Sequence, residues 1–376
     1  MKKDFKKKIS KSALAMAVML SVIGTGEAFA DDVFWYGKSG NAWTTNQSSA
    51  ATSGLTLTLT PSSTAESGSW ADVNYFYGGY SAASATVSGN TLTINAGTYT
   101  SNNGASDFFA GFSDLGVVSG NILTLNSANF TTGIHLEAGN ANGSGNVSGN
   151  IVNINNSTFG DNFEADGGQS SGLTSTTLNN AVNITGSTFN GTATICGSRA
   201  AFGNTTSGTV SVAGGIFSGD TEIRGNSSLK GTATNGKVEI KDSSKFTGQT
   251  TIYGSYTGDN GGAATGGKVT ITGSEFNGND TIIYGSYAES YTAGNATGGE
   301  VTVNGAYFHG DPFAAGDKVY IYGGMGPASA SGNKVTINDI SFSDIFDNCE
   351  LSHLVMTSFL EVIKMFDIAI LYPAPP

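Results

Sequence analysis

The sequence predicts an all-β fold, a parallel β-helix (β-solenoid) with rungs of about 30 residues, and two observations carry this prediction. One phrase, two aliphatic residues two positions apart and then an aromatic, recurs nine times between residues 92 and 342, with successive aromatics 28 to 34 residues apart. Such a period is typical of stacked supersecondary units. Glycine is abundant, at 54 residues, and only 12% of residues are charged, which suits short strands and tight turns.

The first two strands of a rung follow from the seventh copy of the phrase. Val269 and Ile271 share one face of a strand by two-residue alternation. Ser274 and Phe276 also point inward, but the five-residue step from Val269 to Ser274 breaks the parity of a straight strand. Gly273 is therefore the predicted corner, since glycine makes a bend there inexpensive.

A third strand completes the rung after a second bend at residues 277–279. It covers residues 281–285 and has its own signature, an aliphatic residue, a variable residue and glycine, followed by 11 to 15 residues rich in small and polar types. Each strand should pair in parallel with its copy one rung on, about 4.8 Å away. Copies of the signature are Phe76-Tyr77-Gly78, Leu136-Glu137-Ala138, Ile195-Cys196-Gly197, Ile223-Arg224-Gly225, Ile252-Tyr253-Gly254, Ile283-Tyr284-Gly285 and Ile321-Tyr322-Gly323.

The core is predicted to consist of stacks of like residues, aliphatic over aliphatic and Phe over Phe. Four buried side chains per rung contribute at most about 12 kcal/mol, less than the entropy cost of ordering 30 residues, so neighbouring rungs must cover each other. Paired helices of similar period are excluded, because glycine and β-branched residues interrupt every apolar segment.

The N-terminus is predicted to be a secretory signal peptide, residues 1–30. Six lysines precede the apolar stretch 13–24, and Ala28-Phe29-Ala30 is a typical cleavage site. A membrane anchor would need about 18 apolar residues, so no transmembrane helix is expected in the mature chain. The chain is therefore expected to be secreted or displayed at the cell surface.

The mature chain would carry 11 basic and 27 acidic residues, a net charge of −16. Such a surface repels phosphate backbones, so nucleic acid is excluded as a partner. Cys196 and Cys349 are the only cysteines and lie far apart in the repeat order, so both thiols are expected to be free.

The repeat occupies residues 73–342, and both flanks differ from it. Residues 31–72 hold all three tryptophans and an alternating strand, Leu55-x-Leu57-x-Leu59, and are assigned as an N-terminal cap. Residues 343–376 lack glycine after position 345 and are dense in Leu, Met and Ile. This tail is either a true cap or an appended sequence that follows a truncation.

Two kinds of unit alternate along the repeat. One is seen in Tyr77-Gly78-Gly79-Tyr80-Ser81-Ala82 and Ile321-Tyr322-Gly323-Gly324, and the other has the pattern Gly-Asn/Lys-x-Val-Thr-Ile-x-x-x-x-Phe. Together they resemble the passenger regions of bacterial autotransporters. The resemblance is to the YGG-type repeats of large exoproteins and adhesins from anaerobic Gram-negative bacteria, and it covers residues 73–342. It implies a parallel β-helix exported from the cell. Such passengers are normally followed by an outer-membrane barrel, and no series of amphipathic strands of about ten residues follows Phe342 in this sequence.

Catalysis is not expected, and no catalytic residue, metal or cofactor is assigned. Asp107, Asp161, Glu164 and Asp166 would make an acidic corner of the kind that polysaccharide-degrading β-helices use, but paired bases at matched positions are not evident. The three histidines, His135, His309 and His353, are isolated in sequence, which argues against zinc. No G-x-S-x-G elbow and no G-G-x-G-x-D calcium repeat is found.

One binding surface is predicted. If the isoleucines of the third strand point inward, then Tyr253, Tyr284 and Tyr322 form an outward column on consecutive rungs, suited to sugar faces or a partner protein. The alternative is an aromatic ladder that only stiffens the sheet. The leading function is thus an adhesin or surface-interaction scaffold with a host glycan or surface protein as partner. A polysaccharide-degrading enzyme and a truncated passenger without activity are the alternatives.

Overall fold

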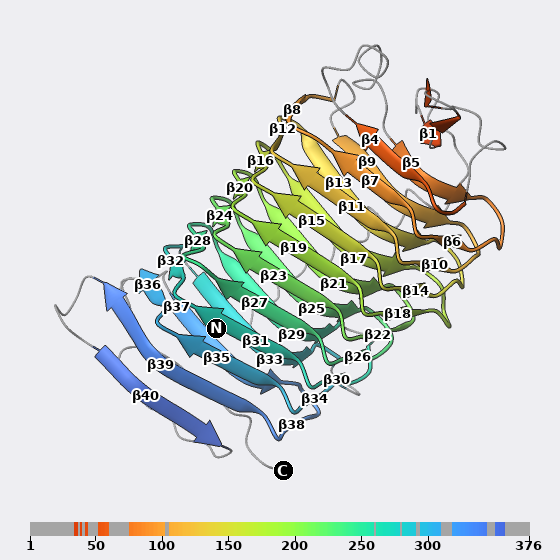
Figure 1. Cartoon of the computed structure of the whole chain (residues 1–376). Helices are drawn as coiled ribbons and strands as arrows, with labels where there is room; N and C mark the ends of the chain where they lie inside the picture. Colours follow the sequence, from red (N-terminus) through yellow and green to blue (C-terminus); the bar gives the residue numbers. More distant parts are fainter. Residues whose placement is uncertain are drawn as a thin grey trace. The chain divides into compact units, whose positions relative to one another are not determined.

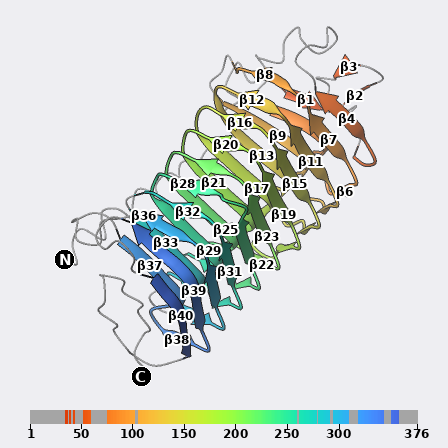
Figure 2. The same cartoon turned by 60° about the vertical axis from the view of Figure 1, so that its left-hand side comes forward.

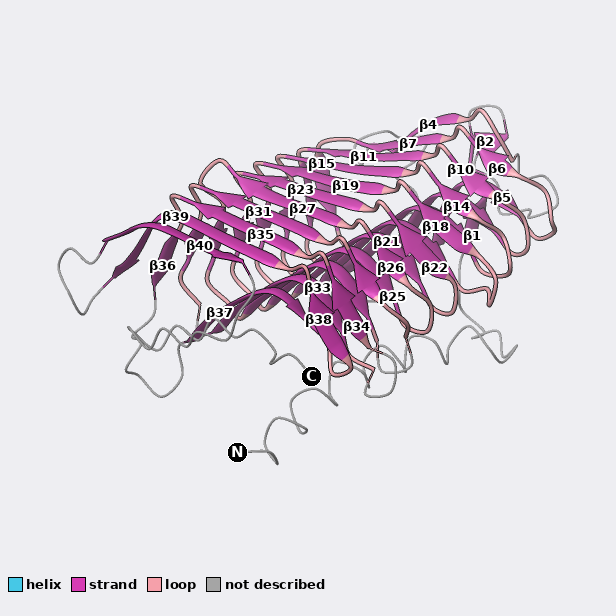
Figure 3. Ribbon diagram, turned by 90° about the horizontal axis from the view of Figure 1, so that it is seen from below, coloured by secondary structure: helices cyan, strands magenta, loops and turns pink. Residues whose placement is uncertain are grey.

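The computed structural model describes the chain in segments that all belong to one compact unit, Phe34–Pro376. These segments are residues 34–36, 38–39, 42–43, 52–59, 75–101, 105–258, 261–278, 280–290, 294–309, 318–343 and 350–357. The predicted signal peptide, residues 1–30, and Cys349 lie outside the described residues. The described part is all β, as Figure 3 shows, and forms a parallel β-solenoid.

Three sheets run along the solenoid, and each rung contributes to all three (Figure 1). The ten-stranded sheet contains β1 (Phe34–Tyr36), β5 (Tyr75–Ser81), β9 (Ala105–Ser113), β13 (Gly133–Ala141), β17 (Phe163–Ser170), β21 (Ala193–Ala200), β25 (Thr221–Ser228), β29 (Thr250–Thr257), β33 (Asp280–Ala288) and β37 (Lys318–Met325). The nine-stranded sheet contains β6 (Val87–Ser88), β10 (Val118–Ser119), β14 (Val147–Ser148), β18 (Thr176–Leu178), β22 (Asn204–Thr206), β26 (Ala233–Thr234), β30 (Ala264–Thr265), β34 (Asn295–Thr297) and β38 (Ser329–Ser331).

The third sheet has nineteen strands because a corner divides its part of most rungs in two. It contains β4 (Thr56–Leu59), β7 (Thr91–Ile94), β8 (Gly97–Tyr99), β11 (Ile122–Asn126), β12 (Ala128–Phe130), β15 (Ile151–Asn155), β16 (Thr158–Phe159), β19 (Ala181–Thr185), β20 (Thr188–Phe189), β23 (Thr209–Ala213), β24 (Ile216–Phe217), β27 (Lys237–Lys241), β28 (Lys245–Phe246), β31 (Lys268–Thr272), β32 (Glu275–Phe276), β35 (Glu300–Asn304), β36 (Tyr307–His309), β39 (Lys334–Ser343) and β40 (Glu350–Thr357). Separately, β2 (Lys38–Ser39) and β3 (Ala42–Trp43) form a small antiparallel pair.

The predicted inward faces are confirmed. Val269 is fully buried and lies in register with Val238 and Val301 of the neighbouring rungs. Ile271 is also buried, whereas Thr270 between them is half-buried. The corner falls at Gly273, which has a φ of +57°, a backbone conformation that favours glycine.

The predicted aromatic stack is confirmed as well. Phe130, Phe159, Phe189, Phe217, Phe246, Phe276 and Phe308 stack in order, with successive ring centroids 4.5 to 5.6 Å apart. Tyr99 extends this ladder toward the N-terminus, 4.8 Å from Phe130. Each ring is covered on both faces by its neighbours, which explains why a single rung cannot form its core alone.

The described parts of the two flanks join the sheets. In the predicted cap, β1 pairs with β5 and β4 pairs with β7, both in parallel, so these residues continue the solenoid. The predicted strand Leu55-x-Leu57-x-Leu59 corresponds to β4, with Leu57 and Leu59 buried. In the tail, β40 lies antiparallel against β39 and covers the edge of the nineteen-stranded sheet. Other residues of both flanks lie outside the described part.

A buried corner between the nine-stranded and nineteen-stranded sheets is built in two ways. In the early rungs an asparagine side chain fills it: Asn90, Asn121, Asn150 and Asn180 bond in sequence, each Nδ2 donating to the next Oδ1 at 2.8 to 3.0 Å. A glycine of the ten-stranded sheet faces each asparagine, and a Cβ on Gly168 would lie 2.5 Å from Asn180 Cγ.

In the later rungs the two residue types change places. Glycine occupies the corner, and a polar side chain replaces the facing glycine. The backbone N–H of Gly236 donates to Ser255 Oγ, and that of Gly267 donates to Ser286 Oγ, each at 3.0 Å. Both arrangements thus place one polar side chain in the same buried space and supply an acceptor for a corner N–H.

Candidate functional site

The outer face of the ten-stranded sheet carries two columns of side chains, aligned from rung to rung by the parallel register. The first column is Tyr77, Phe109, Glu137, Asp166, Cys196, Arg224, Tyr253, Tyr284 and Tyr322. The second column lies three residues further along each strand and is Tyr80, Phe112, Asn140, Gln169, Arg199, Ser227, Tyr256, Tyr287 and Met325. Figure 2 shows these strands side by side.

The two columns touch because the strands bend between them. Residues three apart point to opposite sides of a flat strand. Yet the rings of Tyr253 and Tyr256 meet edge to face with their centroids 5.1 Å apart, and Tyr77 meets Tyr80 in the same way at 5.0 Å. Gly254 stands between the columns in β29, where it permits the bend. This face is therefore concave, and the columns close on each other.

The three predicted binding residues form a ladder, as the sequence indicated. The ring centroids of Tyr253 and Tyr284 are 5.2 Å apart, and those of Tyr284 and Tyr322 are 4.9 Å apart, with planes within 9° of parallel. The expectation of an exposed strip is wrong, because Tyr284 and Tyr322 expose only 7% and 8% of their surface. The physical reason is the bend, which brings Tyr287 to within 4.7 Å of Tyr284 and covers its side.

The stacking also changes what this ladder offers to a partner. Tyr284 has a ring on each face, so a sugar has no free face on which to stack. The accessible part of the ladder is ring edge, and the hydroxyl is its polar group. Burial raises the pKa of Tyr322 to about 12, so its hydroxyl is a neutral hydrogen-bond donor at physiological pH. Binding by these tyrosines stays a prediction.

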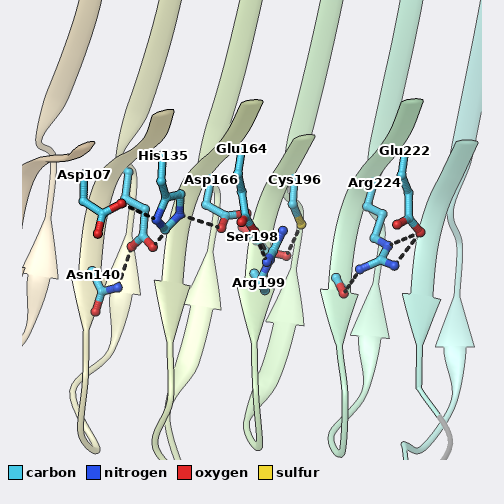
Figure 4. Close-up of polar contacts among 12 residues, drawn as sticks. Asp107, His135, Asn140, Glu164, Asp166, Cys196, Ser198, Arg199, Glu222 and Arg224 are labelled. Atoms are coloured by element: carbon cyan, nitrogen blue, oxygen red, sulfur yellow. Dashed lines mark hydrogen bonds and ion pairs between the residues drawn. The ribbon is translucent and has the colours of Figure 1, made fainter. Parts of the chain in front are cut away.

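In the register of the ten-stranded sheet, a group of ionisable side chains lies between this ladder and the aromatic rings of β5 and β9. Figure 4 shows this group. We call Asp107, His135, Glu137, Glu164, Asp166 and Arg199 the charge cluster. His135 is its centre: Nδ1 lies 3.5 Å from Asp107 Oδ1, while Nε2 lies 2.9 Å from Glu137 Oε1 and 3.7 Å from Asp166 Oδ2. Glu137 and Asp166 expose only 1% and 0% of their surface.

The arginines complete the polar array. Arg199 forms an ion pair with Glu164, and its Nε lies 3.1 Å from Asp166 Oδ1. On the next rung Arg224 forms an ion pair with Glu222 and lies over the ring of Tyr256, 4.3 Å from the centroid. That cation–π contact joins the polar array to the tyrosines, because Tyr256 packs against Tyr253.

Burial and charge perturb the pKa of several of these groups. Burial alone would lower the pKa of His135, but the carboxylates of Glu137, Asp107 and Asp166 around the ring raise it well above 6.5. Burial raises the pKa of Glu137, whereas Arg199 lowers the pKa of Glu164 against the effect of burial. Burial raises the pKa of the free Cys196 thiol to about 12, so that thiol is inert in the folded chain.

A pH dependence of stability follows from His135. A pKa raised by folding means that the protonated ring stabilises the native state fully below about pH 6.5, and that this contribution is lost as the pH rises through the folded-state pKa. In buffer with EDTA, the free energy of unfolding from urea titrations should therefore fall as the pH rises above 6.5. The His135→Gln variant should lose this slope. An identical slope in both proteins would show that His135 does not carry it.

The sequence analysis identified only part of this site. The acidic corner is confirmed for Asp107, Glu164 and Asp166, whereas Asp161 is exposed and lies apart from the charge cluster. The prediction that His135 is isolated is wrong, because His135 has no ligand-forming neighbour in sequence but has several in space. Aligning the rungs on their Leu-Glu-Ala and Ile-x-Gly signatures would have placed it beside Asp107 and Glu164, its partners in register. The isolation of His135 in sequence is therefore no longer an argument against a metal site.

No family model, curated protein sequence or solved structure matches this chain. Within the described residues, no helix has the length and apolar character needed to cross a membrane. The fold and the site geometry thus define the class, a parallel β-solenoid repeat protein with one chemically distinct face.

Proposed function

We propose that this chain is an exported, autotransporter-passenger-like β-solenoid that acts as an adhesin or surface-interaction scaffold without catalysis. Its contact surface is the concave outer face of the ten-stranded sheet, and its partner is a glycan or protein on a host surface. The fold and the sequence resemblance support the class of protein. The distribution of side chains over the three sheets supports the choice of face.

The observation that carries this proposal is the contrast between the sheets. The outward position in the middle of β31 is Thr270, in register with Thr302 and Thr336 of the following rungs. The nine-stranded sheet carries Ser119 and Ser148 in register. Small polar residues of this kind need no function beyond solubility. The nineteen-stranded sheet also carries charges, but these are exposed lysine–glutamate pairs. Aromatic and arginine side chains gathered in register on one face are typical of a binding surface, where they dominate the energy.

The tyrosine ladder supplies the first test. Replacing Tyr253, Tyr284 and Tyr322 together with Phe retains the stacked rings and removes the hydroxyl groups, so the melting temperature should change by only a few degrees. Attachment to immobilised mucin glycans or extracellular-matrix proteins should weaken at least tenfold if the hydroxyl edges make the contact.

The matched control replaces Thr270, Thr302 and Thr336 with Ala on the same rungs and should leave attachment unchanged. Equal attachment by the tyrosine variant and the wild type would show that the ladder only stabilises the sheet and does not bind a partner. A wild-type chain that attaches to no member of the panel would refute the adhesin proposal itself.

The charge cluster favours one alternative, a polysaccharide-degrading enzyme. Carboxylates and an arginine gather on four consecutive rungs, and paired carboxylates are what such chemistry requires. The burial of Glu137 and Asp166 opposes it, because a polymer cannot reach them without moving the neighbouring side chains. Release of unsaturated or reducing ends from acidic polysaccharides, abolished in Glu164→Gln, would favour the enzyme.

A further inference from the structure

The charge cluster contains buried polar atoms that the described part of the chain leaves without a hydrogen bond. They are Glu137 Oε1, both carboxylate oxygens of Asp166, His135 Nε2, and Nε and Nη2 of Arg199. The imidazole and guanidinium nitrogens lie close to the carboxylates but are not aligned to donate. Buried polar atoms in folded proteins are nearly always satisfied, so unpaired carboxylate and imidazole atoms that lie together indicate a ligand.

The charge of the cluster indicates the sign of that ligand. Four carboxylates, on Asp107, Glu137, Glu164 and Asp166, face the single guanidinium of Arg199. With its carboxylates ionised the cluster carries a formal net charge of about −2 when the imidazole is protonated and about −3 when it is neutral, as metal binding requires, and burying uncompensated charge costs several kcal/mol. A cation would offset this cost, and imidazole with carboxylates is a donor set for divalent first-row metals.

We propose that His135 Nε2, Asp166 Oδ2 and a carboxylate oxygen of Glu164 bind a divalent transition-metal cation such as zinc, with Glu137, whose Oε1 faces the same Nε2, as the fourth protein ligand. Donors about 2.0–2.1 Å from a tetrahedral ion lie about 3.3 Å from one another. The distances from Nε2 to the Glu137 and Asp166 oxygens, 2.9 and 3.7 Å, lie on either side of that value. One ligand atom each of His135, Glu164 and Asp166 lies within 4.8 Å of the others.

The opposite atoms of His135 and Glu137 have their own partners, as expected when neighbouring residues orient metal ligands. Asp107 faces Nδ1 of His135, and Asn140 donates to Oε2 of Glu137 at 2.5 Å. Arg199 faces Oδ1 of Asp166 and pairs with Glu164. This arrangement leaves Nε2 of His135 facing Asp166, with Oδ2 3.7 Å away (Figure 4).

The site is tested by metal binding to the full-length chain stripped with EDTA. Cobalt(II) reports the geometry, because four-coordinate cobalt absorbs strongly in the visible range, and calorimetric titration with zinc gives the stoichiometry and Kd. We expect one saturable site per chain. His135→Gln and Asp166→Asn should each weaken zinc binding at least tenfold. Glu222→Gln is the matched control, since Glu222 lies on the same face and pairs with an arginine but has no histidine beside it.

Saturable binding that His135→Gln weakens and Glu222→Gln leaves unchanged supports the proposal. No saturable binding, or equal zinc affinity in His135→Gln and the wild type, overturns it. Far-UV circular dichroism must show that each variant is folded. If Asp166→Asn does not fold, His135→Gln decides the question, because His135 is the more exposed of the two residues.

Discussion

Replacing Ile271 with aspartate should prevent the solenoid from folding. Ile271 is fully buried and lies in register between Ile240 and Val303, so the new carboxylate would enter a stack of aliphatic side chains with no cation or donor. An unpaired buried charge costs several kcal/mol, a large part of the 5–15 kcal/mol that stabilises a typical domain. We expect loss of the cooperative thermal transition and of the β-sheet circular dichroism spectrum.

Thr270→Asp is the matched control on the same strand. Thr270 points outward and pairs with Glu239 and Thr302, so an aspartate there meets water and one like charge. Repulsion from the like charge of Glu239 lowers the free energy of unfolding by up to about 1 kcal/mol. The variant should therefore still fold, with a slightly lower melting temperature. Equal thermal shifts for the two substitutions would refute the inward assignment of the Val-x-Ile strands.

The second large effect concerns the buried corner, where Gly168→Ser should destabilise the chain by about 3–5 kcal/mol. The added Cβ would lie 2.5 Å from Asn180 Cγ, so the amide must move. Asn180 Oδ1 accepts from both the backbone N–H and the Nδ2 of Asn150, at 3.0 Å each, and both donors would lose their partner. Urea unfolding gives the loss of free energy.

A second substitution should restore the stability. Adding Asn180→Gly reproduces the arrangement of the later rungs, in which Gly236 donates to Ser255. The double variant should be more stable than either single variant, with a favourable coupling energy of at least about 2 kcal/mol. Additive effects of the two substitutions would show that the exchange of residue types between rungs is not compensatory.

The inward faces were predictable from the sequence because they depend only on parity and on period. Val269, Ile271 and Phe276 repeat at fixed offsets, and each offset determines a face of a strand regardless of the length of the next loop. The corner at Gly273 followed from an odd offset within an inward-facing set. Local rules of this kind determine the rung, and stacking of equal rungs determines the sheets.

The surface of the ten-stranded sheet was less predictable, because it depends on contacts between rungs. Tyr284 was correctly placed in a column, but its burial depends on a bend that brings Tyr287 against it. His135 meets Asp166 only when two rungs are aligned across a variable loop. Its partners therefore could not be found by looking for ligand spacing along the chain.

The two forms of the buried corner have a consequence for how such a chain changes length. The side chain of Asn180, in the last of the early asparagine rungs, donates to Ser198 Oγ, and the N–H of Gly299, in the last glycine rung, donates to Asn333 Oδ1. At each junction a corner donor of one form thus meets an acceptor of the other form, whichever form comes first. Recombination between repeats that inserts or removes one whole rung should preserve this hydrogen bonding. The number of rungs can therefore change during evolution without compensating substitutions at the new junction.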